Sequence, residues 1–225
     1  MTLINTIGIG GHFNIMSADT RQTMSFFGNE FAYEDQPNKV EFLTGYTMFG
    51  GGGTVGLVNR VKDEMKARVT EDSDLEACYD VLSEVVAEQG LVERINLPVQ
   101  IMLSGFFRDG RNGHVSFKDG SKPRLITYEP SVSGIGVIAL SDDHADMVTE
   151  SEPGNLEACT SVRDYLSAFV THLAHIQGSI AYTDSDTVSP MFKYYVLLNE
   201  PQTGLLRDQG EIDTSQWFEV FKNKA

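Results

Sequence analysis

Basic residues are scarce in this chain of 225 residues. Lysine and arginine number 17 against 32 aspartates and glutamates, which gives a formal charge of −15 and an isoelectric point near 4.6. A nucleic-acid-binding protein needs a basic patch that releases counterions from phosphates, and an anionic membrane surface makes the same demand. The composition therefore excludes both as partners.

Cysteines and long apolar runs are also scarce. The two cysteines, Cys78 and Cys159, fall in helical patterns and are expected to be small apolar residues, with no disulfide framework. No apolar run reaches the length of a membrane span, and the first residues lack the basic region and apolar core of a signal peptide. We find no repeat, low-complexity segment or domain boundary, so we expect one cytoplasmic domain over residues 1–225.

Apolar periodicity gives an order of strands, two helices, strands, one long helix and strands. Helices are expected after the glycine run Gly50–Gly53, from a Ser73 capping box to Gly90, and from Asn155 to Gly178. The acidic segment 141–154 is expected to be an inserted loop, and the residues after 198 a polar tail. Strands are expected at 3–9 and 12–16, which form a hairpin, and at 26–33, 40–49, 99–107, 113–117, 124–128, 134–140 and 191–198. Segregated strand and helix blocks indicate an α+β fold in which two stacked sheets lie between helical layers.

The start of the chain carries the strongest chemical pattern. Thr2 directly follows Met1, Asp19 lies in the sequence Ser-Ala-Asp-Thr-Arg, and Lys39 precedes the glycine run by about ten residues. An N-terminal-nucleophile (Ntn) hydrolase uses such a threonine, whose hydroxyl attacks while its α-amine acts as the base. The chemistry requires that Met1 be removed, because the amine of Thr2 is otherwise part of a peptide bond.

These motifs, in this order, resemble the proteasome β-subunits and the related HslV-type peptidase. The resemblance covers most of the chain and implies a four-layer αββα sandwich of Ntn-hydrolase type. It implies Thr2 as the nucleophile, Lys39 as the charge that favours its deprotonation, and Asp19 as the partner of that lysine. It also implies that Ser133, Asp186 and Ser189 orient the amine, and that the backbone N–H groups of Gly51, Gly52 and Gly53 bind the oxyanion and substrate.

The resemblance further implies peptide or amide hydrolysis without a metal or cofactor. It implies a homo-oligomeric ring, polypeptide substrates and an ATP-dependent unfoldase as partner. The alternative is an inactive structural or assembly subunit that retains Met1, and a third interpretation is an amidase that acts on small molecules. His172 and His175 lie one helical turn apart but lack a third ligand, so we favour packing over a metal site.

Overall fold

The computed structural model describes residues 3–26, 29–35, 39–93, 98–139, 141–151, 153–154 and 156–222. Within these ranges the chain forms two five-stranded antiparallel sheets, a separate two-stranded hairpin and five α-helices. The α+β class predicted from the sequence is therefore confirmed.

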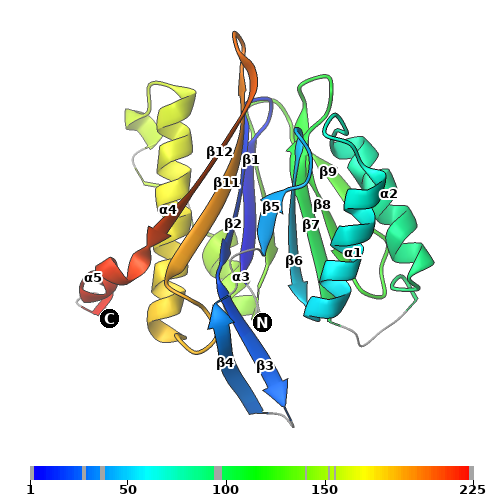
Figure 1. Ribbon diagram of the computed structural model, residues 1–225. Helices are drawn as coiled ribbons and strands as arrows, with labels where there is room; N and C mark the ends of the chain where they lie inside the picture. The colour runs from blue at the N-terminus through cyan, green and yellow to red at the C-terminus, as the bar shows by residue number, and fades with distance from the viewer. Residues whose placement is uncertain are drawn as a thin grey trace.

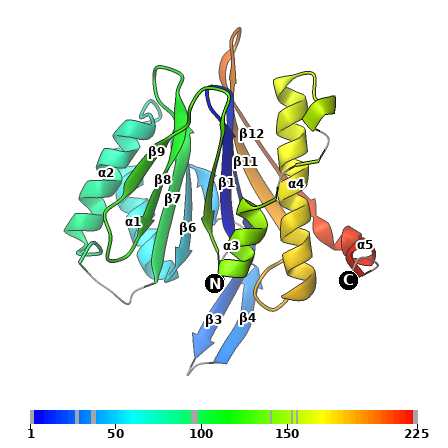
Figure 2. The ribbon, with the colours of Figure 1, turned by 180° about the vertical axis from the view of Figure 1, so that it is seen from behind.

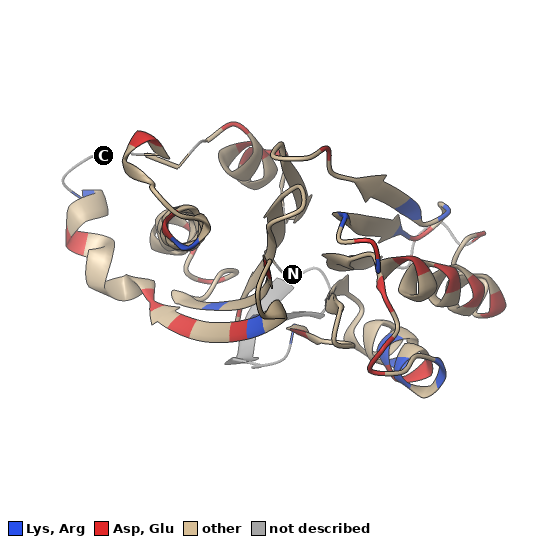
Figure 3. Cartoon of the chain, turned by 90° about the horizontal axis from the view of Figure 1, so that it is seen from above, with Lys and Arg blue, Asp and Glu red and all other residues tan. Residues whose placement is uncertain are grey.

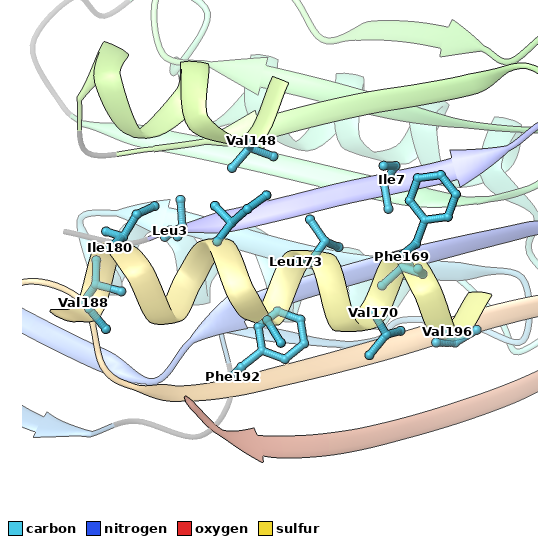
Figure 4. Packing of buried hydrophobic residues seen from close by; sticks show 14 of the residues in the cluster. Leu3, Ile7, Val148, Phe169, Val170, Leu173, Ile180, Val188, Phe192 and Val196 are labelled. Atoms are coloured by element: carbon cyan, nitrogen blue, oxygen red, sulfur yellow. The ribbon is translucent and has the colours of Figure 1, made fainter. Parts of the chain in front are cut away.

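The first sheet contains the chain's beginning and its end, in the order β10-β1-β2-β11-β12. Leu3, Ile7 and Phe13 on one face of this sheet pack beneath the long helix α4, together with Phe169 and Leu173 of that helix (Figure 4). The bounds are β1 Ile4–Ile9, β2 Phe13–Asp19, β10 Ser133–Ile138, β11 Met191–Glu200, β12 Gly204–Asp213 and α4 Val162–Thr183.

The second sheet has the order β5-β6-β7-β8-β9 and is covered by two helices, α1 and α2. The helices lie on the opposite side of the molecule from α4 (Figures 1 and 2). The bounds are β5 Val40–Phe42, β6 Thr47–Gly53, β7 Val99–Phe106, β8 Asn112–Lys118, β9 Arg124–Thr127, α1 Val55–Arg68 and α2 Leu75–Glu88.

The two sheets also pack against each other. A third apolar cluster joins Ile4 and Met16 of the first sheet to Met48 and Met102 of the second. A polar contact crosses the same interface, where the Thr6 hydroxyl donates to the Ser104 hydroxyl at 2.7 Å. The two sheets therefore share an apolar and polar interface.

Two predicted strands are divided in the structure. The expected strand 26–33 is the hairpin of β3 (Arg21–Phe26) and β4 (Asn29–Asp35), which projects from the body below the first sheet (Figures 1 and 2). The expected strand 40–49 is interrupted by a turn at 43–46, and the glycine run continues β6 to Gly53 instead of opening the helix. Close packing explains the glycines: a Cβ on Gly51 would lie 2.3 Å from the Val58 side chain.

The expected capping box at Ser73 is wrong by one residue. The N-cap of α2 is Asp74, whose carboxylate accepts from the backbone N–H of Ala77, while the Ser73 hydroxyl accepts from the N–H of Thr70. Both residues are good caps, so the sequence motif alone does not choose between them.

The acidic segment expected to be a loop contains the helix α3 (Asp142–Thr149). Ser141 caps it by accepting from the N–H of His144, and Asp142 and Asp143 lie in the first turn, where the helix dipole favours negative charge. Val148 alone is buried, which explains why the segment has so weak an apolar period. The next helix, predicted to begin at Asn155 (outside the described residues), is α4, and it begins at Val162 after a Ser161–Asp164 capping box.

The end of the chain holds more structure than the sequence predicted. The supposed polar tail forms β12, a 3-10 helix at Thr214–Trp217 and the helix α5 (Phe218–Lys222). Helix α4 does not end at Gly178 as predicted but continues to Thr183. Gly178 is needed there because Thr214 packs against it: a Cβ on Gly178 would lie 2.9 Å from Cβ of Thr214.

Acidic positions occur on helices, strands and loops in both halves of the fold, and basic positions are fewer (Figure 3). In the part of the chain that the structure describes, no helix combines the length and apolar character needed to cross a bilayer.

Candidate functional site

The most buried ion pair near the chain's beginning joins Lys39 to Asp19. Nζ of Lys39 lies 2.9 and 3.0 Å from the two carboxylate oxygens of Asp19, and it also donates to the carbonyl of Arg21. The side chain of Asp19 is 0% exposed and that of Lys39 is 10% exposed. A charge buried this deeply needs such a partner, because desolvation otherwise disfavours the charged form.

The backbone explains why residues 20 positions apart meet. Asp19 ends β2, the chain leaves through β3, and β4 returns it to Lys39, which directly precedes β5. The carboxylate also accepts from the backbone N–H of Arg21 at 2.8 Å, so the base of the hairpin is fixed to the ion pair.

Asp19 is also bonded to the beginning of β1. Its Oδ1 accepts from the backbone N–H of Leu3 at 3.0 Å, and its own N–H donates to the carbonyl of Leu3 at 3.3 Å. Leu3 follows the predicted nucleophile, Thr2, which lies outside the described residues. The ion pair therefore adjoins the residue next to that threonine in the chain.

Ser189 is the third predicted residue that the structure brings to this region. The hydroxyl of Thr20, the neighbour of Asp19, donates to Oγ of Ser189 at 3.0 Å, and both residues are buried. The guanidinium of Arg21 donates to the carbonyl of Ser185, which links the hairpin base to the turn that precedes Ser189.

Two further predicted residues, Ser133 and Asp186, are exposed. Strands β1 and β10 are antiparallel, and Ser133 is exposed and pairs with Ile9 at one end of them. The pair Ile4 and Ile138 lies at the other end, next to Leu3. Five residues of strand place Ser133 about 16 Å along the sheet from that end. Asp186 is exposed in the turn before Ser189.

The glycines predicted to bind an oxyanion lie in β6. The N–H of Gly51 already donates to the carbonyl of Lys39 at 3.2 Å, which holds the lysine backbone against this strand. Gly52 and Gly53 pair with Gln100 and Val99 on the other side. Gly53 has a φ of +100°, and a Cβ there would lie 1.6 Å from the carbonyl oxygen of Pro98, so the position requires glycine.

Ser141, to which the sequence pattern assigned no role, lies shortly after β10 in the chain. Strand β10 runs antiparallel to β1, so the residues after Ile138 continue toward the Leu3 end, where Ser133 does not reach. Ser141 lies three residues beyond Ile138 and caps α3. A serine followed by two aspartates is a typical start of a helix, so this motif could have predicted the helix at 142–149.

The ion pair can act in only some kinds of chemistry. A charged lysine stabilises a nearby anion and lowers the pKa of a neighbouring hydroxyl.

Among the residues described, no group of three histidine, cysteine, aspartate or glutamate side chains could hold a metal ion. His175 instead stacks on Trp217, with ring centroids 4.6 Å apart.

A second buried polar pair lies between the sheets. Nδ1 of His114 and the hydroxyl of Tyr128 are 2.9 Å apart, and the residues are 3% and 5% exposed. Burial, with a smaller contribution from the charge of Arg124, lowers the pKa of His114 to about 4, and burial raises the pKa of Tyr128. Gly134 and Gly136 make room for the two rings, since a Cβ on either would lie within 3.1 Å of them.

Comparison with known proteins gives a structural match only. No family model matches the chain, and no curated protein matches it. Its fold is similar to that of the Gly-1 mutant of Anbu from Hyphomicrobium sp. strain MC1, with a TM-score of 0.65 and 11% sequence identity. The alignment covers 100% of this chain and 94% of that chain, and at this identity it shows a shared fold alone.

The expected membership of the proteasome β-subunit and HslV-type family is wrong. No family model supports it, and the structural similarity is to Anbu at an identity that shows the fold alone. The motifs that suggested the family are short, and the spacing between Asp19 and Lys39 is occupied here by the hairpin β3–β4.

Proposed function

We propose that this chain is an amide or peptide hydrolase of threonine type, with Thr2 as its N-terminal nucleophile after removal of Met1. The observation that carries the proposal is the buried Asp19–Lys39 pair bonded to the backbone of Leu3. The hydroxyl of Thr2 would attack the carbonyl carbon, and the α-amine would accept the hydroxyl proton and pass it to the leaving amine as the amide C–N bond breaks. A water molecule would then hydrolyse the ester on Thr2, which releases the acid and restores the hydroxyl. That amine has an ordinary pKa near 8, so it is a suitable base near neutral pH.

The environment of Lys39 supports this role. Both oxygens of Asp19 and the carbonyl of Arg21 hold the ammonium group in one place, so its charge is fixed before the substrate arrives. A preorganised charge stabilises a developing alkoxide without a reorganisation step during the reaction. Ser189, linked through Thr20, is the predicted amine-orienting residue with the best support.

The same proposal includes the layer order of an Ntn hydrolase in one domain over 1–225. Three apolar clusters support it: one beneath α4, one beneath α1 and α2, and one between the sheets. They link the beginning, middle and end of the described chain.

Hydrolysis of peptides tests the proposal. Protein that begins at Thr2 should hydrolyse an unfolded polypeptide or a fluorogenic peptide, and Thr2→Ala should not. A matched control carries a short extension before Thr2, which keeps the side chain but places the amine in a peptide bond. Activity that survives in Thr2→Ala, or in the extended protein, would exclude Thr2 as the nucleophile.

The alternative is an inactive structural or assembly subunit that retains Met1. The position of Ser133, about 16 Å along the sheet from the Leu3 end of β1, favours it. The N–H of Gly51 also favours it, because it already donates to the carbonyl of Lys39. In that case Thr2→Ala should leave every measurable property unchanged.

A homo-oligomeric ring with an ATP-dependent unfoldase remains a prediction. Sedimentation of the purified protein tests the ring, because a monomer has a mass of 24.9 kDa and a closed ring is a multiple of it. Sedimentation as a monomer at all concentrations would contradict the prediction.

A further inference from the structure

The linker between α4 and β11 is held by two buried side chains. The amide Nε2 of Gln177 donates to the carbonyls of Ser189 and Met191, at 3.1 and 3.0 Å. Between them, the carbonyl of Pro190 accepts from both the hydroxyl and the N–H of Thr214, at 2.7 and 3.0 Å. Three consecutive carbonyls of an irregular segment are thus satisfied by Gln177 and Thr214.

These bonds are made in the interior. Gln177 and Thr214 are 0% exposed, and Ser189 is 1% exposed. A buried carbonyl without a donor is unfavourable, so these hydrogen bonds favour this one conformation of the linker. The planar amide of Gln177 reaches two carbonyls at once, which fixes their separation as well as their direction.

The same linker meets the candidate site through Ser189. Its hydroxyl accepts from the hydroxyl of Thr20 and from the N–H of Met191, each at 3.0 Å. Thr20 follows Asp19, and Asp19 pairs with Phe192 in the register of β2 and β11. The position of the Ser189 hydroxyl relative to the ion pair therefore depends on the linker conformation.

The segment that follows Thr214 packs against α4, which fixes the position of Thr214. Trp217 stacks on His175 of α4, and Phe221 packs against both His175 and Tyr182. Val188 of the linker and Phe192 of β11 pack in the cluster beneath α4 that also contains Leu3 and Ile180 (Figure 4).

We infer that Gln177 and Thr214 are positioning residues for the proposed hydrolase site. They act through the linker, which sets where the Ser189 hydroxyl meets Thr20 beside the Asp19–Lys39 pair. The inference rests on the proposed function for its effect on rate, but the positioning itself has a physical readout that does not require activity.

Two variants test it. Gln177→Leu removes both donors at similar volume, and Thr214→Val removes the hydroxyl but keeps the shape. Each should lower kcat about tenfold or more with KM nearly unchanged, because a small displacement of a catalytic constellation has effects of this size. Thr214→Ser keeps the hydroxyl and should restore most of the rate.

Amide hydrogen exchange measures positioning without activity. In Gln177→Leu and Thr214→Val, exchange of the Met191 N–H should accelerate, whereas α1, α2 and the second sheet should be unchanged. Leu173→Ala is the control for general destabilisation: Leu173 is buried and packs α4 on the first sheet but donates no hydrogen bond to residues 189–191, so exchange of the Met191 N–H should not be accelerated selectively.

The outcomes separate the two proposals. An inactive wild-type protein with selective acceleration at Met191 keeps the positioning role and removes the hydrolase. An active wild-type protein whose two variants keep full kcat and normal exchange at Met191 overturns the positioning role alone. Acceleration spread equally over all of α4 and β11, as in Leu173→Ala, also overturns it.

Discussion

Two of the buried polar pairs in the described part of the chain differ in their charge. Asp19 and Lys39 form an ion pair within hydrogen-bond distance at the end of β2. His114 and Tyr128 lie between the sheets without a compensating opposite charge, and burial keeps both neutral. The side chains of both pairs are almost fully buried, so the two pairs differ in whether an oppositely charged partner is present.

The difference separates a structural group from a candidate chemical one. A neutral hydrogen-bonded pair satisfies the polar atoms of an interface and requires no further explanation. A buried ion pair is seldom the most stable choice, because apolar residues of similar size often replace it without loss. Its presence beside Leu3 is therefore a reason to look for chemistry at the chain's beginning.

The largest effect is expected at the nucleophile. Thr2→Ala should remove hydrolysis completely while the free energy of unfolding changes by less than about 0.5 kcal/mol, as for an ordinary surface substitution. A peptide-cleavage assay and a urea titration measure the two quantities on the same preparation. A variant that has lost several kcal/mol of stability would show that Thr2 has a structural role.

The next effect concerns the charged pair. Lys39→Met leaves the carboxylate of Asp19 buried without its partner, and we expect a loss of about 3–5 kcal/mol in the free energy of unfolding, together with loss of hydrolysis. Urea denaturation checks the first result. The double variant Asp19→Asn, Lys39→Met should recover part of the stability and none of the activity.

If Lys39→Met instead has the same midpoint of urea unfolding as the wild-type protein, Lys39 does not offset the free-energy cost of burying the Asp19 carboxylate. The comparison with His114 would then have no energetic basis.

The third effect follows from the pKa of His114. The folded value is about 4 and the unfolded value about 6.5. Between these values the unfolded chain binds a proton that the folded chain does not, so stability falls as the pH falls from about 6.5 to about 4. The total loss is about 3 kcal/mol.

Urea titrations across this range should show a steeper loss in the wild-type protein than in His114→Gln, which retains polarity without the titration. Subtracting the two curves removes the contribution of the carboxylates. Parallel curves would show that protonated His114 is tolerated between the sheets.

The smallest effect belongs to the neutral hydrogen bond. Tyr128→Phe leaves Nδ1 of His114 without its partner and should lower the free energy of unfolding by about 1–2 kcal/mol. Tyr182→Phe, at a residue that is 36% exposed, is the matched control and should have almost no effect. Thermal unfolding of both variants measures the difference, and equal melting temperatures would contradict the assigned bond.

Much of the fold follows from local signals. The hairpin of β1 and β2, the helices α1 and α2, and the strands from 99 to 138 were predictable because their apolar periods are regular. Helix α3 was not, since Val148 is its only buried residue. The strand β12 was missed because it is an edge strand with few buried positions, which leaves little apolar alternation to detect.

The site was predictable only in part. Strand ends and a hairpin bring Asp19, Lys39 and Ser189 into one region, and their catalytic roles stay predictions. The place of Ser133 at the other end of β10 from Leu3 depends on the antiparallel register of β10 with β1, which the sequence motif does not reveal. Gln177 and Thr214 carry no sequence signal, since each acts on the backbone of a distant linker.

The most direct test of the central claim is the intact mass of the protein before and after treatment with a threonine-directed electrophile. The account predicts a mass that lacks Met1 and a single adduct that maps to Thr2 and is absent from Thr2→Ala. A mass that includes Met1, with no adduct on Thr2, would contradict the proposed hydrolase and favour the inactive subunit.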